Sequence, residues 1–392
     1  MATGTRAGLL DAPRPQSVYK HALLERYMIQ FATMTSKPLS PRRSTLVDAF
    51  AGRGRHDDGT PASGEQMMLA AQKAAGQKDP VAISIFLVEQ SRRDFVTLDS
   101  VADEYRATGL DIVTRHGSCA DHLDEIDQKA LGSSLFMFID PCGALLPWTT
   151  LQPLLARRGT WPRTEALLNF NADFTRRACG QLRKNQLDLG GVAALDTVCG
   201  GTWWRDVAMD ALIESGGVGF EAPANAVSHE YARRLAESTG MRFSVSAVRR
   251  NIHLQPVYHL VFLTPNETGL WVMNNAAAVA RQLWLHELGP DEDAETGMLF
   301  PMFTVEEQIA REKVEAVARI EENLVLVVAD GSPKEVVRHT TEVFDGVYGI
   351  AKETYFSEAV RNLVKGGRLA YHTKASRPRS HVLVTPPGAG SS

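Results

Sequence analysis

Three acidic residues stand where short apolar runs end, and each could contact a small polar ligand. Asp48 lies near the end of STLVDAF (44–50), Glu89 follows VAISIFLV, and Asp140 follows LFMFI. A carboxylate at the end of a second strand can accept hydrogen bonds from the hydroxyls of a ribose. Because the carboxyl ends of parallel strands line the ligand crevice of an α/β sheet, we expect these three carboxylates to face one cleft.

A glycine-containing turn follows the first of these runs. The segment VDAFAGRG (47–54) combines small residues with backbone amides, so a ligand can approach the backbone closely there. The candidate cofactor-binding residues of this segment are Asp48, Phe50, Gly52 and Gly54, together with Glu89. An ordinary strand-to-helix turn with a solvent-facing Glu89 is the alternative.

The fourth apolar run leads into Asp140-Pro141-Cys142, which are the candidate catalytic residues. An Asp before a rigid Pro can present its carboxylate, and the neighbouring peptide carbonyl, to an exocyclic amine. Alternatively, Asp140 only caps the following helix. Cys142 could act as a nucleophilic thiolate, as in methylation of carbon-5 of cytosine, or be a small buried residue. Asn169, at the end of the fifth run, is a candidate substrate contact or the cap of a turn.

The elements that position these residues alternate along the chain. Strands are expected at 44–50, 81–88, 110–114, 135–139 and 165–170, with helices at 18–34, 65–75, 92–106, 121–131 and 151–157. This alternation predicts a parallel sheet with helices on both faces. Two later strands, 243–249 and 257–264, are joined by a short link and predict a terminal antiparallel hairpin. Five parallel strands and a hairpin are the order expected of the Rossmann-like class I methyltransferase sheet, an α/β fold.

Four parts of the chain are predicted. They are a leader with an N-terminal helix (1–43), a methyltransferase-like α/β domain (44–285), an acidic linker (286–303) and a winged-helix-like domain (304–388). Within the α/β domain, residues 173–216 are predicted to form a helical insert. The last part is predicted because a helix, a turn and a second helix precede a hairpin with a basic tip.

Several motifs together resemble the three-Cys-motif partner protein family, whose typical pattern is D-x-F-A-G-P-G followed by F-x-D-P-Y/F-G. They are DAFAGRG, GEQMMLA, FLVEQ, FIDPCG and EALLNF, with KHALLERYM before them and YHLVFLT after them, over about residues 18 to 285. The family looks like a branch of the S-adenosylmethionine-dependent methyltransferase fold. The resemblance implies S-adenosylmethionine as cofactor, its methionine portion held by Asp48, Gly52 and Gly54 and its ribose by Glu89. It also implies that Asp140 borders the transfer site.

The chain departs from the family pattern at several positions. Arg53 replaces a Pro, and Ser118 stands where an acidic residue often follows the third strand, which makes Asp121 a substitute candidate for the adenine contact. Cys142 and Gly143 replace the Pro and the aromatic residue of the D-P-P-Y motif of amino-methyltransferases. The aromatic side chain that would stack on a flipped base is therefore absent from this motif.

Charge is distributed unevenly. The 42 Lys and Arg residues against 46 Asp and Glu give a net charge of −4, which excludes coating of nucleic acid through overall charge but leaves room for a basic patch. Between residues 352 and 381 the only acids are Glu353 and Glu358. Candidate phosphate contacts in this stretch are Lys352, Arg361, Lys365, Arg377 and Arg379. A module for dimerisation or protein contact is the alternative.

The composition excludes several further classes of protein. Four cysteines with no C-x-x-C pair predict neither a zinc site nor a disulfide framework, and no apolar run reaches the roughly 18 residues of a membrane span. We expect a cytoplasmic protein without a metal. The favoured function is S-adenosylmethionine-dependent methylation of DNA or RNA, with Asp140 orienting a base amino group. Alternatives are a catalytically silent partner or regulatory protein, and a small-molecule methyltransferase that dimerises through the winged helix.

Overall fold

The structure is a computed structural model that describes residues 15–158, 163–187, 190–288 and 304–386. It divides into two compact units, the first built mainly from Leu24–Pro265 and the second mainly from Asn266–Ser392. Helix α1 (Pro15–Thr35) contributes residues to both units. Of the predicted parts, residues 1–14 of the leader and residues 289–303 of the acidic linker lie outside the described residues.

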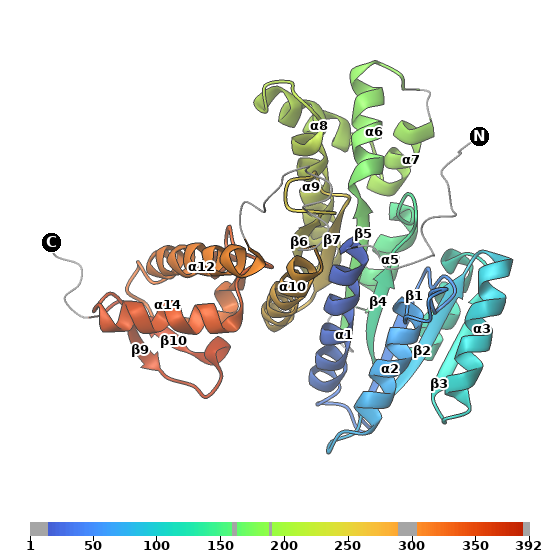
Figure 1. Ribbon diagram of the computed structural model, residues 1–392, viewed down its shortest axis with the longest axis horizontal. Coiled ribbons are helices and arrows are strands. Elements are labelled where there is room, and N and C mark those ends of the chain that lie inside the picture. The colour runs from blue at the N-terminus through green and yellow to red at the C-terminus, as the bar shows by residue number, and fades with distance from the viewer. Residues whose placement is uncertain (1–14, 159–162, 188–189, 289–303, 387–392) are drawn as a thin grey trace. The chain divides into compact units, whose positions relative to one another are not determined.

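The first unit contains a seven-stranded sheet with the order β3-β2-β1-β4-β5-β7-β6 (Figure 1). Its strands are β1 (Arg43–Asp48), β2 (Ala82–Glu89), β3 (Asp111–His116), β4 (Ser134–Ile139), β5 (Thr164–Asn171), β6 (Arg242–Val248) and β7 (Tyr258–Thr264). The first five strands pair in parallel, and β7 runs antiparallel to both β5 and β6. Five parallel strands followed by an antiparallel hairpin are therefore confirmed.

Helices connect successive parallel strands. They are α2 (Ser63–Ala75), α3 (Arg92–Arg106), the short η2 (Cys119–His122) with α4 (Leu123–Lys129), and α5 (Trp148–Arg158). Four more helices follow β5, namely α6 (Ala172–Arg183), α7 (Gly190–Cys199), α8 (Trp203–Glu214) and α9 (Glu221–Thr239). Helices α6, α7 and α8 occupy the segment 173–216, where the sequence predicted a helical insert.

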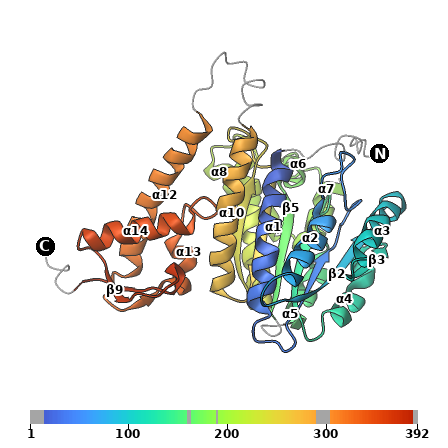
Figure 2. The same ribbon diagram turned by 60° about the horizontal axis from the view of Figure 1, so that its bottom comes forward.

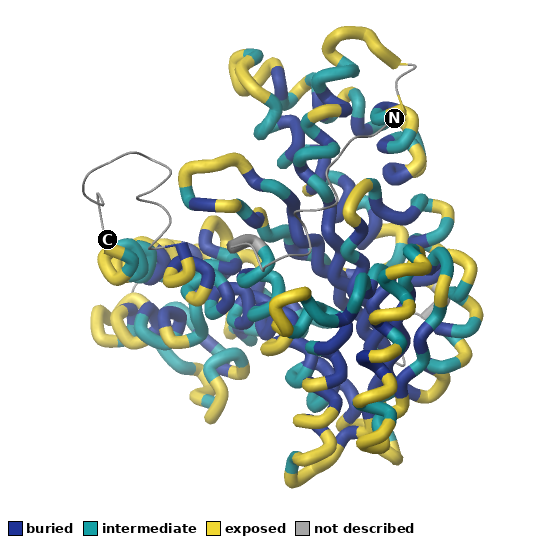
Figure 3. The backbone as a smooth tube through the Cα atoms, turned by 45° about the vertical axis from the view of Figure 1, so that its right-hand side comes forward, coloured by how far each residue is buried: buried dark blue, intermediate teal, exposed yellow. Residues whose placement is uncertain are grey.

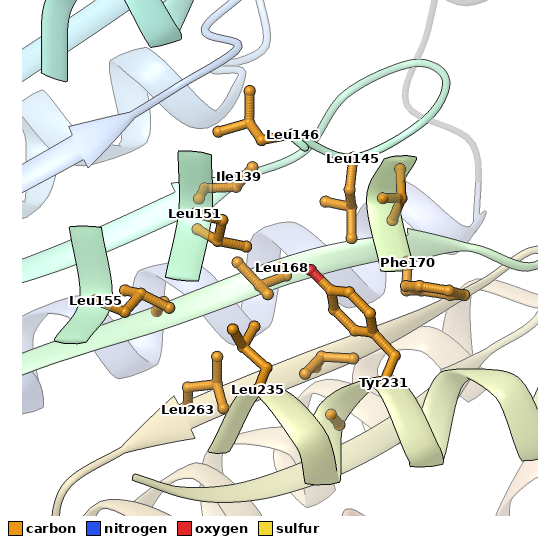
Figure 4. Packing of buried hydrophobic residues seen from close by; sticks show 14 of the residues in the cluster. Ile139, Leu145, Leu146, Leu151, Leu155, Leu168, Phe170, Tyr231, Leu235 and Leu263 are labelled. Carbon is orange, nitrogen blue, oxygen red and sulfur yellow. The ribbon is translucent and has the colours of Figure 1, made fainter. Parts of the chain in front are cut away.

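The central strands are buried on both faces. Every residue of β4 is buried, which explains why its sequence, SLFMFI, is apolar without a two-residue alternation. In Figure 3 the buried segments run together through the interior, with exposed segments around them. On one face, Leu168 of β5 belongs to the same apolar cluster as Tyr231 and Leu235 of α9 (Figure 4). On the other face, the Tyr27 ring of α1 lies 5.2 Å from the Phe262 ring, and Figure 2 shows α1 running alongside the strands.

The second unit joins helices to a small antiparallel sheet. It contains α10 (Glu267–Leu288), α12 (Val305–Val327), β8 (Lys334–Glu335), η3 (Val336–His339), α13 (Thr340–Val343), α14 (Glu353–Lys365), β9 (Ala370–Thr373), η4 (Pro378–Ser380) and β10 (Val382–Val384). The strand order is β8-β10-β9. Strand β8 was not predicted, because two residues are too few to form a periodic pattern.

The core of this second unit is built around one tryptophan of α10. The Trp271 ring lies 4.9 Å from the Phe344 ring and 5.0 Å from the Phe356 ring of α14. The sequence predicted that the α/β domain extends to residue 285, which includes most of α10. In the structure, α10 instead packs with the helices that follow it, because its buried face carries Trp271.

Candidate cofactor and acceptor site

The turn after β1 contains two glycines with left-handed backbone angles, φ +60° at Gly52 and +77° at Gly54. They differ in their surroundings. A Cβ atom at Gly52 would meet no atom within 4 Å, whereas one at Gly54 would lie 3.0 Å from Cδ1 of Leu98 in α3. Gly54 is therefore required for close packing, and Gly52 leaves open space beside its backbone.

Glu89 at the end of β2 connects to this turn. Its Oε2 accepts a hydrogen bond from the Gly52 amide at 2.9 Å, and its Oε1 accepts one from the Ser91 amide at 2.6 Å. A carboxylate offers about four lone-pair positions, so positions for hydroxyl donors remain. The structure thus brings Gly52 and Glu89 together at the carboxyl ends of β1 and β2.

Asp48 stabilises the turn by accepting a hydrogen bond from its backbone. It is fully buried, and its Oδ1 accepts a hydrogen bond from the Phe50 amide at 3.0 Å. Phe50 is half-buried and packs against the main apolar cluster. Asp48 therefore does not present an exposed carboxylate to a cleft, in contrast to the sequence expectation, because it is enclosed by the turn that it holds.

The turn is also bound to α3 by an ion pair that the sequence did not predict. Arg53 Nε lies 2.7 Å from Asp94 Oδ1, and Arg53 Nη1 lies 2.8 Å from Asp57 Oδ1. The hydrogen bond that Arg53 donates to Asp94 is the largest cause of the raised pKa of Arg53. No spacing rule signals this contact, because Arg53 and Asp94 are 41 residues apart.

The segment after β3 lies beside the end of β2. The Gly117 amide donates to the Glu89 carbonyl oxygen at 3.1 Å, so Ser118 follows directly at the same edge of the sheet. Ser118 Oγ accepts a hydrogen bond from the Ala120 amide and caps η2, while Asp121 is exposed. Both candidate adenine contacts thus lie in the segment that follows β3, the strand that neighbours β2.

Asp140 and Asn169 meet at the ends of the neighbouring strands β4 and β5. Asn169 Nδ2 donates a hydrogen bond to Asp140 Oδ1 at 2.5 Å. Asn169 is only 7% exposed, and its Oδ1 has no hydrogen-bond partner among the described residues. The structure therefore joins a predicted catalytic residue to a predicted substrate contact 29 residues further along the chain.

The residues after Asp140 form a partly exposed loop. Pro141 is buried, and Cys142 is exposed and in no disulfide. The other three cysteines are buried, and burial raises the pKa of the Cys119 and Cys179 thiols to about 12. Cys142 is the exposed cysteine of the described residues.

A small pocket with room for about one water molecule lies beside this loop. It is lined by residues of the loop, the end of β5 and the insert helices: Gly143, Ala144, Leu145, Phe170, Asn171, Phe174, Thr175, Leu195 and Val198. A larger pocket lies at the opposite, amino-terminal ends of β1 to β3 and includes Arg43, Asp111 and Lys129. That second pocket contains none of the predicted site residues.

The predicted phosphate contacts of the second unit fall into two groups. Arg361, Lys365 and Arg377 are exposed. Lys352 Nζ instead donates to Gln282 Oε1 at 2.7 Å, and burial lowers the pKa of the half-buried Arg379. The structure thus leaves three of these five side chains directly accessible.

No group of three or more His, Cys, Asp or Glu side chains in the described part of the chain is arranged to hold a metal ion. Among the described residues, no helix combines the length and the apolar character that crossing a bilayer requires.

No protein-family model matches this sequence, and no curated protein matches it. Several solved structures are similar. The methyltransferase domain of bacterial CtHen1 is 10% identical and aligns with 63% of this chain and 99% of its own, with a TM-score of 0.32. A geranyl diphosphate C-methyltransferase from Streptomyces coelicolor A3(2) is 13% identical and aligns over 66% and 88%, with a TM-score of 0.26. An uncharacterised protein from Listeria monocytogenes serotype 4b is 10% identical and aligns with 81% of this chain and 96% of its own, with a TM-score of 0.29.

The class of the first unit is defined by its own sheet rather than by these matches. The order β3-β2-β1-β4-β5-β7-β6 with an antiparallel β7 is that of the Rossmann-like methyltransferase fold. The resemblance to the three-Cys-motif partner family stays a prediction, because no family model matches.

Proposed function

We propose that this chain is an S-adenosylmethionine-dependent methyltransferase that acts on nucleic acid. The observation that carries the proposal is the hydrogen bond between the Gly52 amide and Glu89, which joins the glycine turn to the carboxylate of β2 on a methyltransferase-type sheet. Fold alone does not define a function, so the proposal depends on this local geometry.

The residues present fit the proposed cofactor. The open space beside Gly52 gives room for a ligand, and Glu89 retains lone pairs for ribose hydroxyls. Ser118 and Asp121 would border the adenine, and Asp48, Phe50 and Gly54 would hold the turn at the methionine portion. When bound, this cofactor supplies an electrophilic methyl group on a positively charged sulfur.

The acceptor would be held from the neighbouring strands. Asp140 and Asn169 form a polar pair, Pro141 fixes the start of the loop, and the exposed Cys142 borders it. The contribution of these residues to the rate would come mainly from positioning.

The second unit would hold the nucleic acid. From α12 onward, its order of one long helix, a short strand, two further helices and a two-stranded hairpin is typical of a winged-helix module. Exposed Arg361 and Lys365 on α14, with Arg377 in the hairpin, would contact phosphates. Methylation of a small molecule is the second candidate function, favoured by Cys142 and Gly143, which stand where amino-methyltransferases carry a Pro and the aromatic residue that stacks on a base.

Titration calorimetry with S-adenosylhomocysteine tests the cofactor proposal. We expect the full chain to bind, and the variant Glu89→Ala to bind at least about tenfold more weakly, because hydrogen bonds from hydroxyls to a carboxylate contribute about 1.5–3 kcal/mol. Glu237→Ala is the matched control, since its exposed carboxylate lies on α9 in an ion pair with Arg233. Equal affinity of wild type and Glu89→Ala, or no binding at all, contradicts the proposal.

The acceptor class is tested by labelling. The protein is incubated with methyl-labelled S-adenosylmethionine and separate pools of DNA, RNA, protein and metabolites. We expect label in a nucleic-acid pool. Label only in the metabolite pool favours the second candidate function, and binding of cofactor without transfer to any pool favours a catalytically silent partner protein.

A further inference from the structure

The contact between Asp140 and Asn169 fixes the orientation of the Asn169 amide. An ionised carboxylate can only accept hydrogen bonds, whereas an amide has one donating end and one accepting end. The short contact of 2.5 Å to Asp140 Oδ1 therefore requires the NH₂ group of Asn169 to face the carboxylate. As a consequence, Asn169 Oδ1 is the end of the amide that does not contact Asp140.

This Oδ1 atom is a buried acceptor that lacks a donor. Asn169 is 7% exposed, and within the described ranges no group donates a hydrogen bond to Oδ1. A buried polar atom without a partner costs about 1–3 kcal/mol, so most such atoms in folded proteins are paired. A ligand that brings an N–H or O–H group to this position would remove that cost.

We propose that Asn169 is a specificity-determining residue that, together with Asp140, receives the two N–H groups of one neutral amino group on the acceptor. The inference rests on the proposed methyl transfer and narrows its acceptor to one chemical class. A heteroaromatic amine is neutral at pH 7 and carries two N–H donors in one plane. A hydroxyl group carries a single hydrogen, and an alkylammonium nitrogen has no lone pair to attack with.

The transfer step balances with these residues. The nitrogen lone pair forms the new N–C bond, the electron pair of the breaking S–C bond stays on sulfur, and the nitrogen then loses one proton to Asp140. The product is a secondary amine with one N–H group. It can no longer satisfy both Asp140 and Asn169, so a single methylation is expected.

The experiment compares homopolymers that differ in their exocyclic group. Full-length protein and methyl-labelled S-adenosylmethionine are incubated with single-stranded DNA and RNA homopolymers of adenine and cytosine, which carry amino groups. Parallel reactions contain polymers of hypoxanthine and of thymine or uracil, which carry oxo groups. We expect label only in the amino polymers, recovered as the monomethylated base on mass spectrometry of the nucleosides.

Variants of Asn169 separate recognition from folding. Asn169→Leu removes the acceptor oxygen at similar volume, and we expect kcat/KM on the amino polymer to fall about tenfold or more while the affinity for S-adenosylhomocysteine changes less than about twofold. Asn169→Asp restores an acceptor beside Asp140, so activity should return with a pH profile displaced upward, because two adjacent carboxylates disfavour joint ionisation. Asn185→Gly is the matched amide deletion, since Asn185 is exposed with φ +54°, a conformation that glycine adopts freely.

The outcomes distinguish this inference from the function on which it rests. The inference is overturned by label in an oxo polymer, by a dimethylated base, or by unchanged kcat/KM in Asn169→Leu. It is also overturned if the protein binds S-adenosylhomocysteine but labels neither kind of polymer. Failure of the wild type to bind S-adenosylhomocysteine overturns the proposed function instead.

Discussion

Arg53 illustrates how one residue can define the geometry of the glycine turn. Arg53 lies between Gly52 and Gly54 in the sequence, and its guanidinium is paired with Asp94 of α3 and with Asp57. A second arginine, Arg55, bonds to Glu65 and Glu104. The turn is therefore held against two helices by charged hydrogen bonds rather than by the rigid Pro of the family pattern.

Replacement of this arginine should loosen the turn without unfolding the domain. We expect Arg53→Gln to weaken S-adenosylhomocysteine binding by about tenfold, because a hydrogen bond between charged groups contributes about 1.5–3 kcal/mol. Calorimetry gives the affinity, and the melting temperature reports stability. Arg233→Gln on α9 is the control, since this arginine also bridges two carboxylates, Glu230 and Glu237. Unchanged affinity in Arg53→Gln would show that the ion pair does not position the turn.

At the scale of elements, α1 is attached to the sheet through a buried carboxylate. The Tyr27 hydroxyl donates to Glu165 Oε2 at 2.5 Å, and the Thr264 hydroxyl donates to Glu165 Oε1 at 2.7 Å. Burial is the largest influence and raises the pKa of Glu165 to about 7, while Tyr27, Thr264 and the charge of Arg163 act in the opposite direction. This network links α1, β5 and β7 in one place.

The raised pKa makes stability depend on pH with a defined sign. The folded state binds the Glu165 proton more tightly than the unfolded state, whose pKa is about 4.3. The contribution of this proton is therefore fully present below about pH 4 and is lost as pH rises through about 7. As the pH rises from 4 to 8, we expect the free energy of unfolding of Glu165→Gln to increase by roughly 2–4 kcal/mol relative to that of the wild type. Urea unfolding of both proteins across this range measures the difference, and a pH-independent difference would contradict the prediction.

For the whole molecule, the net charge of −4 is an average over regions of opposite sign. The exposed cations of α14 and the β9–β10 hairpin, namely Arg361, Lys365, Arg368, Lys374 and Arg377, lie within 17 residues of sequence on the second unit. Such a cluster binds phosphates by releasing counterions, which makes affinity depend on salt concentration.

Salt titrations test whether this cluster is a nucleic-acid interface. Combined replacement of Arg361, Lys365 and Arg377 by Ala should weaken DNA and RNA binding for all sequences. The slope of log affinity against log salt should decrease by about one for each lost phosphate contact. Arg319→Ala is the control, because this arginine of α12 is paired with Glu322 and Asp345. An unchanged slope, or the dissociation of a dimer instead, would assign the cluster to protein contact.

Local patterns in the sequence were sufficient for most of the fold. The apolar runs at 81–88 and 135–139 became β2 and β4, and the helical spacing over 92–106 became α3, because strand and helix periodicity depend on neighbouring residues. The short strand β8 and the packing of α10 with the second unit were not predictable in this way.

The sequence by itself determined which residue types stand at the carboxyl ends of the strands, including Glu89, Asp140 and Asn169. Only the tertiary structure decided which of them meet. Asn169 contacts Asp140 across 29 residues, Arg53 contacts Asp94 across 41, and Tyr27 contacts Glu165 across 138. These contacts depend on strand order and helix packing, which bring segments together that are distant in the sequence. No local periodicity encodes them.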